Sequence, residues 1–299
     1  MDKIDLQGKR ILVTGGNGYL GQFLVKALEN EKANVFILDK NVEPSAKAFQ
    51  VDITKKEEVE EAISQIKPEI IFHLAAILNR ERNFDNFQVS NNINHLGTYH
   101  LLEALKTIPY TNFIFTSTSE IYGDNQAPFH EEQLPDAVSP YSLTKVYSEN
   151  LIKTFSKLND KSFTILRLFN FFGENMPAEF FIPQLIESLK TQEKFDMTEG
   201  GQIRDFLHID DVISALVLAG QQTEPTNEIY NVCSGTGVTL KELVKTIQNE
   251  LKSNCKINFG ALPYRANEVW NMVGDNTKIE KELGFIPKYK IEAAVRKVV

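Results

Sequence analysis

Residues 10–21 read RILVTGGNGYLG, and this stretch decides the fold. An apolar run at 10–13 leads into a turn with Gly15, Gly18 and Gly21, and apolar residues at spacings of three and four follow it. Glycines at this spacing let the backbone turn tightly and approach a pyrophosphate, which the N-terminus of the next helix attracts through its free NH groups. The stretch therefore predicts a strand, a glycine turn and a helix that together bind a dinucleotide. The alternative is a tight strand–helix turn without a ligand.

The same alternation of apolar runs and amphipathic stretches continues to about residue 170. Continuous apolar strands separated by helices indicate a parallel sheet covered on both faces. We therefore predict an α/β fold with a doubly wound parallel (Rossmann) sheet, in which residues 1–170 form the dinucleotide-binding domain. Glycine, proline and asparagine interrupt residues 171–299 more often, so we expect mainly a smaller C-terminal substrate-binding lobe there, with some segments returning to the large domain. The expected later strands lie at 35–38, 49–51, 70–74, 113–115 and 163–168, and later helices at about 179–191 and 239–251.

The bulk composition excludes several classes of protein. The chain has 299 residues and a net charge of −8, which argues against a nucleic-acid-binding surface. Its two cysteines, Cys233 and Cys255, and its five histidines show no metal-ligand or redox spacing, so we expect no metal site. No apolar run approaches the length of about 18 residues that a membrane helix needs, and the N-terminus is polar. We therefore expect no membrane segment and a cytoplasmic location.

Acidic residues follow the next two apolar runs, and the first of them favours NAD. Asp39 ends the second run, where a carboxylate hydrogen-bonds the hydroxyls of the adenosine ribose and repels a 2′-phosphate. We therefore expect NAD rather than NADP, although the neighbouring Lys40 is a basic group that tolerates a phosphate. Asp52 and Ile53, after the third run, are expected to bracket the adenine.

Residues 113–123, FIFTSTSEIYG, end an apolar run in a cluster of hydroxyl residues and one carboxylate. Further on, SPYSLTK at 139–145 places Tyr141 and Lys145 four apart, on one face of a helix for which the Ser-Pro pair supplies an N-cap and a first turn. An ammonium and a cationic nicotinamide near the phenol favour the phenolate, so we expect Lys145 to lower the pKa of Tyr141. The alternative is a solvated helix with a common tyrosine and a common lysine.

Taken together, these motifs resemble the extended short-chain dehydrogenase/reductases, and within them the nucleotide-sugar epimerases, dehydratases and ketoreductases. The resemblance extends from Lys9 to about residue 290 and rests on VTGGNGYLG, Asp39, HLAA at 73–76, FTSTSEIYG, YSLTK and GGQIRDFLHIDDV. It implies an NAD-dependent enzyme that acts on a nucleoside-diphosphate sugar. It also implies a homodimer, in which residues 91–106 and 141–158 form a four-helix bundle with their copies.

The resemblance assigns roles residue by residue. Tyr141 would exchange a proton with the sugar 4-hydroxyl, Thr118 would hydrogen-bond the same oxygen, and Lys145 would hold the nicotinamide ribose. The predicted cofactor-binding residues are Gly15, Asn17, Gly18, Tyr19, Leu20, Gly21, Asp39, Lys40, Asp52, Ile53, Leu74, Ala75, Ala76, Asn94, Tyr141 and Lys145. The predicted substrate-binding residues are Thr118, Ser119, Asn170, Phe181, Arg204 and Arg265, the two arginines as diphosphate partners. The alternative for either arginine is a surface ion pair.

Glu120, two residues after Thr118, leaves the reaction open. The first interpretation is hydride transfer at the sugar C4 by a 4-epimerase or 4-ketoreductase in deoxysugar or surface-polysaccharide biosynthesis. The second is a 4,6-dehydratase or uronate decarboxylase, because those groups carry an acid at this position and use it as a catalytic residue. A non-catalytic NAD-binding regulator is the third. Arg80 and Arg82, where the chain departs from the family pattern, are candidates for contact with a substrate carboxylate or phosphate, and the alternative is that they are simply solvated.

Overall fold

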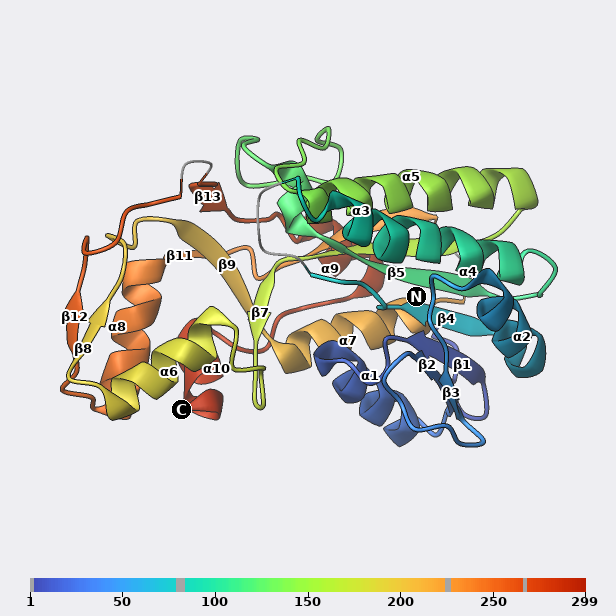
Figure 1. The fold of residues 1–299 in the computed structure, drawn as a ribbon, viewed down its shortest axis with the longest axis horizontal. Helices are drawn as coiled ribbons and strands as arrows, with labels where there is room; N and C mark the ends of the chain where they lie inside the picture. Colours follow the sequence, from blue (N-terminus) through green and yellow to red (C-terminus); the bar gives the residue numbers. More distant parts are fainter. Residues whose placement is uncertain (1–2, 79–83, 224–226, 266–267) are drawn as a thin grey trace.

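A parallel sheet of seven strands forms the larger lobe (Figure 1). The computed structural model describes residues 3–78, 84–223, 227–265 and 268–299. The strand order, β10-β6-β5-β4-β1-β2-β3, reverses direction between β1 and β4, and ligands bind at the carboxyl ends of strands at such a point. The predicted doubly wound α/β sheet is therefore confirmed. Its strands are β1 (Arg10–Thr14), β2 (Asn34–Asp39), β3 (Ala48–Gln50), β4 (Ile70–His73), β5 (Asn112–Thr118), β6 (Phe163–Leu168) and β10 (Glu228–Val232).

Helices cover both faces of this sheet. On one face, α1 (Tyr19–Asn30), α7 (Ile209–Gly220) and α9 (Thr277–Leu283) bury residues such as Leu24, Leu216 and Ile279. On the other face, α2 (Lys56–Ile66), α4 (Gly97–Leu105) and α5 (Pro140–Asn159) bury residues such as Ile63 and Leu101. Burial on both faces explains why the strands are apolar throughout rather than alternating. Two short helical segments, α3 (Phe87–Ser90) and η1 (Asn91–Leu96), directly precede α4, and a third, η2 (Ser119–Tyr122), directly follows β5.

The smaller lobe lies at one end of the molecule (Figure 1). Its main sheet joins β7, β9, β11 and β13, and a separate pair joins β8 and β12. Helices α6, α8 and α10 pack together over a third hydrophobic core. The elements are β7 (Asn170–Phe172), α6 (Phe181–Thr191), β8 (Lys194–Asp196), β9 (Ile203–His208), β11 (Gly237–Thr239), α8 (Leu240–Leu251), β12 (Lys256–Asn258), β13 (Asn271–Met272) and α10 (Ile291–Val298).

The start of α5 follows the sequence prediction. The Ser139 hydroxyl accepts a hydrogen bond from the NH of Ser142 at 3.1 Å, the Ser142 hydroxyl accepts one from the NH of Ser139, and Pro140 is the first helical residue. This capping box fixes the start of the helix at Pro140, one residue before Tyr141. Tyr141, Lys145 and Glu149 then follow one another on one face of α5, toward the sheet.

Candidate active site

The glycine turn lies between β1 and α1. Gly15 has a φ of +69°, and a Cβ there would stand 2.8 Å from the backbone nitrogen of Ala75. A Cβ on Gly21 would stand 2.1 Å from the Gly15 carbonyl oxygen, so the close approach of α1 to the turn requires glycine. Among the described residues, no side chain caps α1 at Gly18, so its first NH groups face the turn. The turn therefore fits a pyrophosphate bound by backbone NH groups.

Asp39 ends β2 beside this turn. Its carboxylate accepts the backbone NH of Asn17 at 3.0 Å and that of Asn41 at 2.9 Å. The structure thus brings Asn17 and Asp39 together at the predicted ribose end of the site. Asp52 instead closes its own turn, because it accepts the NH of Thr54 at 2.9 Å, a bond that lowers the pKa of Asp52. Of the other predicted cofactor residues, Lys40 and Ala76 are exposed, Leu20, Leu74 and Ala75 are half-buried, and Ile53 is buried.

His73 joins three elements beneath the turn, although it was not predicted as a site residue. Its Nδ1 lies 2.7 Å from the Thr14 hydroxyl and its Nε2 lies 2.9 Å from the Thr98 hydroxyl. The Thr14 hydroxyl in turn accepts the NH of Ala75 at 3.2 Å. Burial, aided by the charge of Lys145, lowers the pKa of His73 to about 3, so the imidazole is neutral at ordinary pH. A polar residue at the end of an otherwise apolar strand was the available signal.

Asn94, a predicted cofactor-binding residue, lies inside a helical segment. It belongs to η1, a π-helical turn between α3 and α4, and such turns are frequent at functional sites. Its Oδ1 accepts the NH of Ile77 at 2.8 Å, and its Nδ2 donates to the Thr144 hydroxyl at 3.0 Å. Because Ile77 lies in the loop after β4 and Thr144 lies on α5, the Asn94 side chain connects that loop to α5.

Thr118, Tyr141 and Lys145 meet at the carboxyl end of β5. The Thr118 hydroxyl forms a hydrogen bond with Tyr141 and accepts the NH of Glu120 at 3.2 Å. Lys145 Nζ donates to the carbonyl oxygen of Thr116 at 2.8 Å and lies 5.9 Å from the centre of the Tyr141 ring. The three residues predicted to share a proton-transfer site are therefore neighbours.

The protein's own groups hold the pKa of Tyr141 above its ordinary value. Burial raises it above its ordinary value and the charge of Glu120 adds to this, while the hydrogen bond with Thr118 acts in the opposite direction. Burial also lowers the pKa of Lys145 to about 7, against the attraction of Glu149. Burial disfavours charge on both side chains, so the protein's own groups keep the phenol neutral, and the expected lowering of the Tyr141 pKa by Lys145 together with a cationic nicotinamide stays a prediction.

Glu120 stands next to this cluster. It lies half-buried in the first turn of η2, and its charge is one of the causes that raise the pKa of Tyr141. The carboxylate on which the two reaction classes differ is therefore part of the same site.

The predicted substrate residues Ser119 and Asn170 meet at a residue that the sequence did not single out. The Ser119 hydroxyl donates to Met272 Sδ at 3.3 Å, and Asn170 Nδ2 approaches the same sulfur at 3.7 Å. Met272 comes from β13, so the end of β5 contacts the smaller lobe here. Ser119 is buried, Asn170 is half-buried, and Phe181, the first residue of α6, is 37% exposed.

Arg204 and Arg265 differ in their surroundings. Arg204, on β9, forms an ion pair with Glu268 at 2.8 Å, and the Glu268 carboxylate also accepts a bond from Gln202 Nε2 at 3.1 Å. The ion-pair alternative for Arg204 is thus present in the structure, in a largely buried setting, while Arg265 is exposed. The predicted contacts of both arginines with a diphosphate stay predictions. Arg80 and Arg82 lie outside the described residues.

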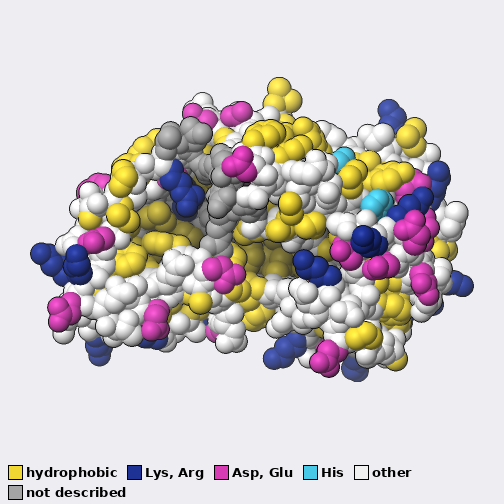
Figure 2. All heavy atoms as spheres, viewed as in Figure 1, with side chains coloured by type: hydrophobic (Ala, Val, Ile, Leu, Met, Phe, Trp, Pro, Cys, Tyr) yellow, Lys and Arg dark blue, Asp and Glu magenta, His cyan; other side chains and the backbone are white. Residues whose placement is uncertain are grey.

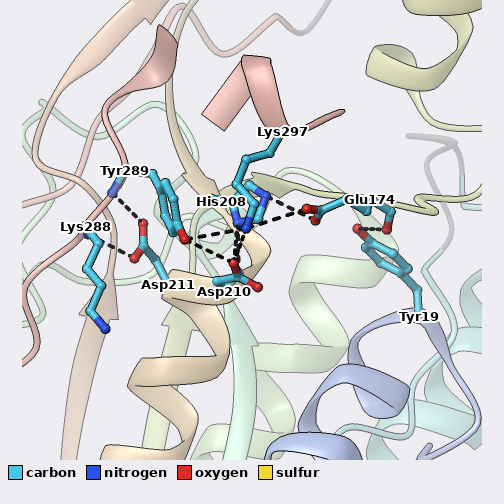
Figure 3. A network of polar contacts seen from close by, with 8 residues as sticks. All are labelled: Tyr19, Glu174, His208, Asp210, Asp211, Lys288, Tyr289 and Lys297. Carbon is cyan, nitrogen blue, oxygen red and sulfur yellow. Dashed lines mark hydrogen bonds and ion pairs between the residues drawn. The ribbon is translucent and has the colours of Figure 1, made fainter. Parts of the chain in front are cut away.

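Tyr19, in the glycine turn, extends the site toward the smaller lobe (Figure 3). Its hydroxyl donates to the backbone oxygen of Glu174 at 3.2 Å, and its ring lies parallel to that of Phe171 at 6.4 Å. The Glu174 carboxylate lies 3.3 Å from Nε2 of the buried His208 and 3.5 Å from Lys297 Nζ. Figure 3 shows that the side chains of Tyr19, Glu174, His208 and Lys297 converge from α1, the segment after β7, the end of β9 and α10, in that order. Tyr19 therefore links the cofactor turn to the smaller lobe rather than pointing into solvent.

The surface seen in Figure 2 is recessed between the two lobes, with hydrophobic side chains on its floor.

Within 3–78, 84–223, 227–265 and 268–299, no three histidine, cysteine or acidic side chains are grouped so that they could hold a metal ion. In the same ranges, no helix has the length and apolar character needed to cross a membrane.

Comparisons with known proteins agree with this geometry. The profile of the NAD dependent epimerase/dehydratase family matches residues 11–233. A putative UDP-glucose 4-epimerase of Methanocaldococcus jannaschii is 30% identical over 97% of both chains, and a CDP-abequose synthase of Salmonella muenchen is 29% identical over 97% of both. A UDP-glucuronic acid 4-epimerase of Bacillus cereus, solved with UDP-glucuronic acid and NAD, superimposes with a TM-score of 0.87 at 26% identity and covers 96% of each chain. The chain is an enzyme of the NAD dependent epimerase/dehydratase family, and the predictions of an enzyme and of NAD as its cofactor are confirmed.

Proposed function

We propose that this enzyme transfers hydride at C4 of a nucleoside-diphosphate sugar, as a 4-epimerase or a 4-ketoreductase. The observation that carries the proposal is the meeting of Thr118, Tyr141 and Lys145 at the carboxyl end of β5, on the same edge of the sheet as the glycine turn. We also propose that residues 1–170 hold NAD and that residues 171–299 supply most of the sugar-nucleotide site. The names of the relatives, with their different bases and sugars, support the substrate class rather than one substrate.

The protein's residues divide the chemistry as follows. A nicotinamide held next to Tyr141 and Lys145 would supply the hydride acceptor and donor. Tyr141 moves the proton on the substrate's O4, and Thr118 donates a hydrogen bond to the same oxygen, so the oxygen is held at one place while its charge changes. Lys145, whose Nζ lies 5.9 Å from the centre of the Tyr141 ring, would supply a positive charge beside the phenol when it is protonated, and such a charge favours the phenolate. Arg204 and Arg265 would neutralise the diphosphate, Arg204 after exchanging Glu268 for a phosphate oxygen.

Glu120 supports a second candidate function. A keto group at C4 acidifies the proton at C5, and a carboxylate beside Tyr141 is placed to take part in removal of water from C5 and C6 or in loss of a C5 carboxylate. This would make the enzyme a 4,6-dehydratase or a uronate decarboxylase.

One experiment separates these candidates. The enzyme is incubated with NAD or NADH and a panel of UDP-, dTDP-, CDP- and GDP-sugars, including uronates and 4-keto sugars, and the products are analysed by mass spectrometry and NMR. An unchanged mass with a new NMR spectrum indicates epimerisation, and a gain of two hydrogens indicates ketoreduction. Loss of water or of carbon dioxide indicates the second candidate. Glu120→Gln should leave the first reaction largely intact and abolish the second, while no conversion of any sugar would refute both.

We also propose that the enzyme is a homodimer that pairs along η1, α4 and α5. Large apolar side chains on these elements are exposed, namely Leu96, Tyr99 and Tyr147 at 38%, 40% and 39%. Light scattering should give twice the mass of the chain, 33.9 kDa, and Tyr99→Glu should give the monomer mass. A wild-type protein that is monomeric at micromolar concentration would exclude the dimer.

A further inference from the structure

A buried ion pair lies directly behind the proposed catalytic residues. Glu149 on α5 and Arg167 on β6 are 1% and 2% exposed, and they form two hydrogen bonds, of 2.8 Å to Oε2 and 3.1 Å to Oε1. The Ser117 hydroxyl donates a third bond to Oε1 of Glu149 at 2.5 Å. Both charges are almost completely buried, and neither side chain is among the proposed binding or proton-transfer residues.

This pair connects to every member of the catalytic cluster. Ser117 lies between Thr116, whose carbonyl oxygen accepts the bond from Lys145, and Thr118, whose hydroxyl meets Tyr141. Glu149 lies one helical turn after Lys145, which itself lies one turn after Tyr141. One carboxylate therefore fixes the end of β5 against the helix that carries both the tyrosine and the lysine.

The far side of the pair is equally well anchored. Arg167 Nη1 donates to the Tyr122 hydroxyl at 2.8 Å and to the Glu131 carbonyl oxygen at 3.0 Å, and the Tyr122 hydroxyl donates to Asn231 at 2.6 Å. A buried ion pair is weak evidence for stability, because well-packed apolar side chains of similar volume serve a fold as well. A rigidly held pair next to a buried amine calls for a different explanation.

The negative charge of Glu149 near the amine of Lys145 explains the pair. The titratable groups that face Lys145 are Tyr141 and Glu149 from α5 and His73 from β4, which is neutral at ordinary pH. Glu149 thus supplies the negative charge that opposes the cost of burying the ammonium. Arg167 balances Glu149 in turn and also donates to the Tyr122 hydroxyl, and it is not among the groups whose charge shifts the pKa of Lys145.

We propose that Glu149 is a positioning residue of the active site: it holds the end of β5 through Ser117 and keeps the ammonium of Lys145 charged beside Tyr141. This inference rests on the proposed function for the importance of Lys145, but the charge of Lys145 is measurable without turnover. Arg167 and Ser117 act through Glu149 and touch neither cofactor nor substrate.

The test is a titration of Lys145 by NMR in the full-length enzyme labelled with 13C-lysine. Its Cε signal is assigned by its loss in Lys145→Arg, and the pH is varied with and without NAD. In Glu149→Gln the midpoint should fall by at least about one pH unit, which corresponds to a tenfold change in proton affinity. Ser117→Ala is the matched control, because it removes a bond to Glu149 and keeps the charge, so the midpoint should not move.

A second variant covers the case in which Glu149→Gln does not fold. Glu149→Leu combined with Arg167→Met removes both charges and leaves an apolar pair, and the midpoint of Lys145 should again fall. A midpoint equal to wild type in whichever of these variants is folded would overturn the proposal, as would an equal fall in Ser117→Ala. The proposed function is judged separately by wild-type turnover: if wild type converts sugars, Glu149→Gln should lower kcat at neutral pH at least about fivefold with little change in KM. If wild type converts none, the titration still decides the role of Glu149.

Discussion

Replacing Tyr141 by phenylalanine tests the centre of the proposed mechanism. The change removes one oxygen that hydrogen-bonds to Thr118 and leaves the ring in contact with Lys145. Loss of a positioned proton donor costs about 10²- to 10⁴-fold in rate, or roughly 3–5 kcal/mol of activation free energy. Loss of one partly buried hydrogen bond costs only about 0.5–1.5 kcal/mol of folding free energy. Turnover should therefore fall by at least about a hundredfold while thermal unfolding and NAD affinity change little.

The assay measures kcat with the sugar identified by the product panel, NAD affinity by calorimetry, and stability by thermal unfolding. Tyr147→Phe is the matched control, because Tyr147 lies on the same helix and is exposed, with its ring centre 5.6 Å from that of His95. It should keep wild-type turnover. A rate for Tyr141→Phe within tenfold of wild type, with NAD still bound, would refute the assignment of the proton relay to this phenol.

Three further predictions concern the cofactor turn and the lysine. Gly21→Ala places a Cβ 2.1 Å from the Gly15 oxygen, so denaturant unfolding should show a loss of about 1–3 kcal/mol; unchanged stability would contradict the close approach. Asp39→Ala removes the acceptor of the Asn17 NH and the proposed ribose ligand, so calorimetry should show NAD binding at least about tenfold weaker, and unchanged affinity would exclude this ribose site. Lys145→Met should abolish turnover yet stabilise the fold at pH 6–7 by on the order of 4 kcal/mol, because burial lowers the pKa of Lys145 to about 7 from 10.5. Because folded Lys145 binds its proton more weakly than unfolded Lys145 does, the wild type loses folding free energy at every pH below 10.5, and most of all below about 7. The stability advantage of the variant should therefore shrink as the pH rises from about 7 to 10.5. A difference in stability that stays constant with pH would contradict this cause.

The parts of the site that the sequence predicted are those fixed by local backbone geometry. The glycine turn follows from φ at Gly15 and from the approach of α1, and both are properties of residues within one strand–turn–helix unit. The start of α5 follows from a capping box within a few residues. Tyr141 and Lys145 then share a face because a helix places residues four apart together.

The supporting contacts could not be predicted in this way, because they join elements that only the tertiary fold brings together. Glu149 meets Arg167 because β6 lies beside β5 under α5, and nothing near either residue in the sequence marks it as charged and buried. Glu268 reaches Arg204 from a different segment of the smaller lobe. Met272 joins Ser119 to Asn170 for the same reason, since β13 pairs with β9 rather than with its neighbours in the chain.

The pKa of Tyr141 shows what a prediction from neighbouring residues leaves out. One nearby ammonium predicts a lowered pKa, but burial acts on the phenol and the amine together, and it disfavours charge on both. The protein alone therefore favours a neutral phenol next to a lysine that titrates near neutral pH. A charged pair at this place requires a negative group that holds the proton on Lys145 and a positive group that favours the phenolate. Glu149 is placed to be the first, and the oxidised nicotinamide, when bound, supplies the second, so the proton relay and the binding of NAD depend on each other.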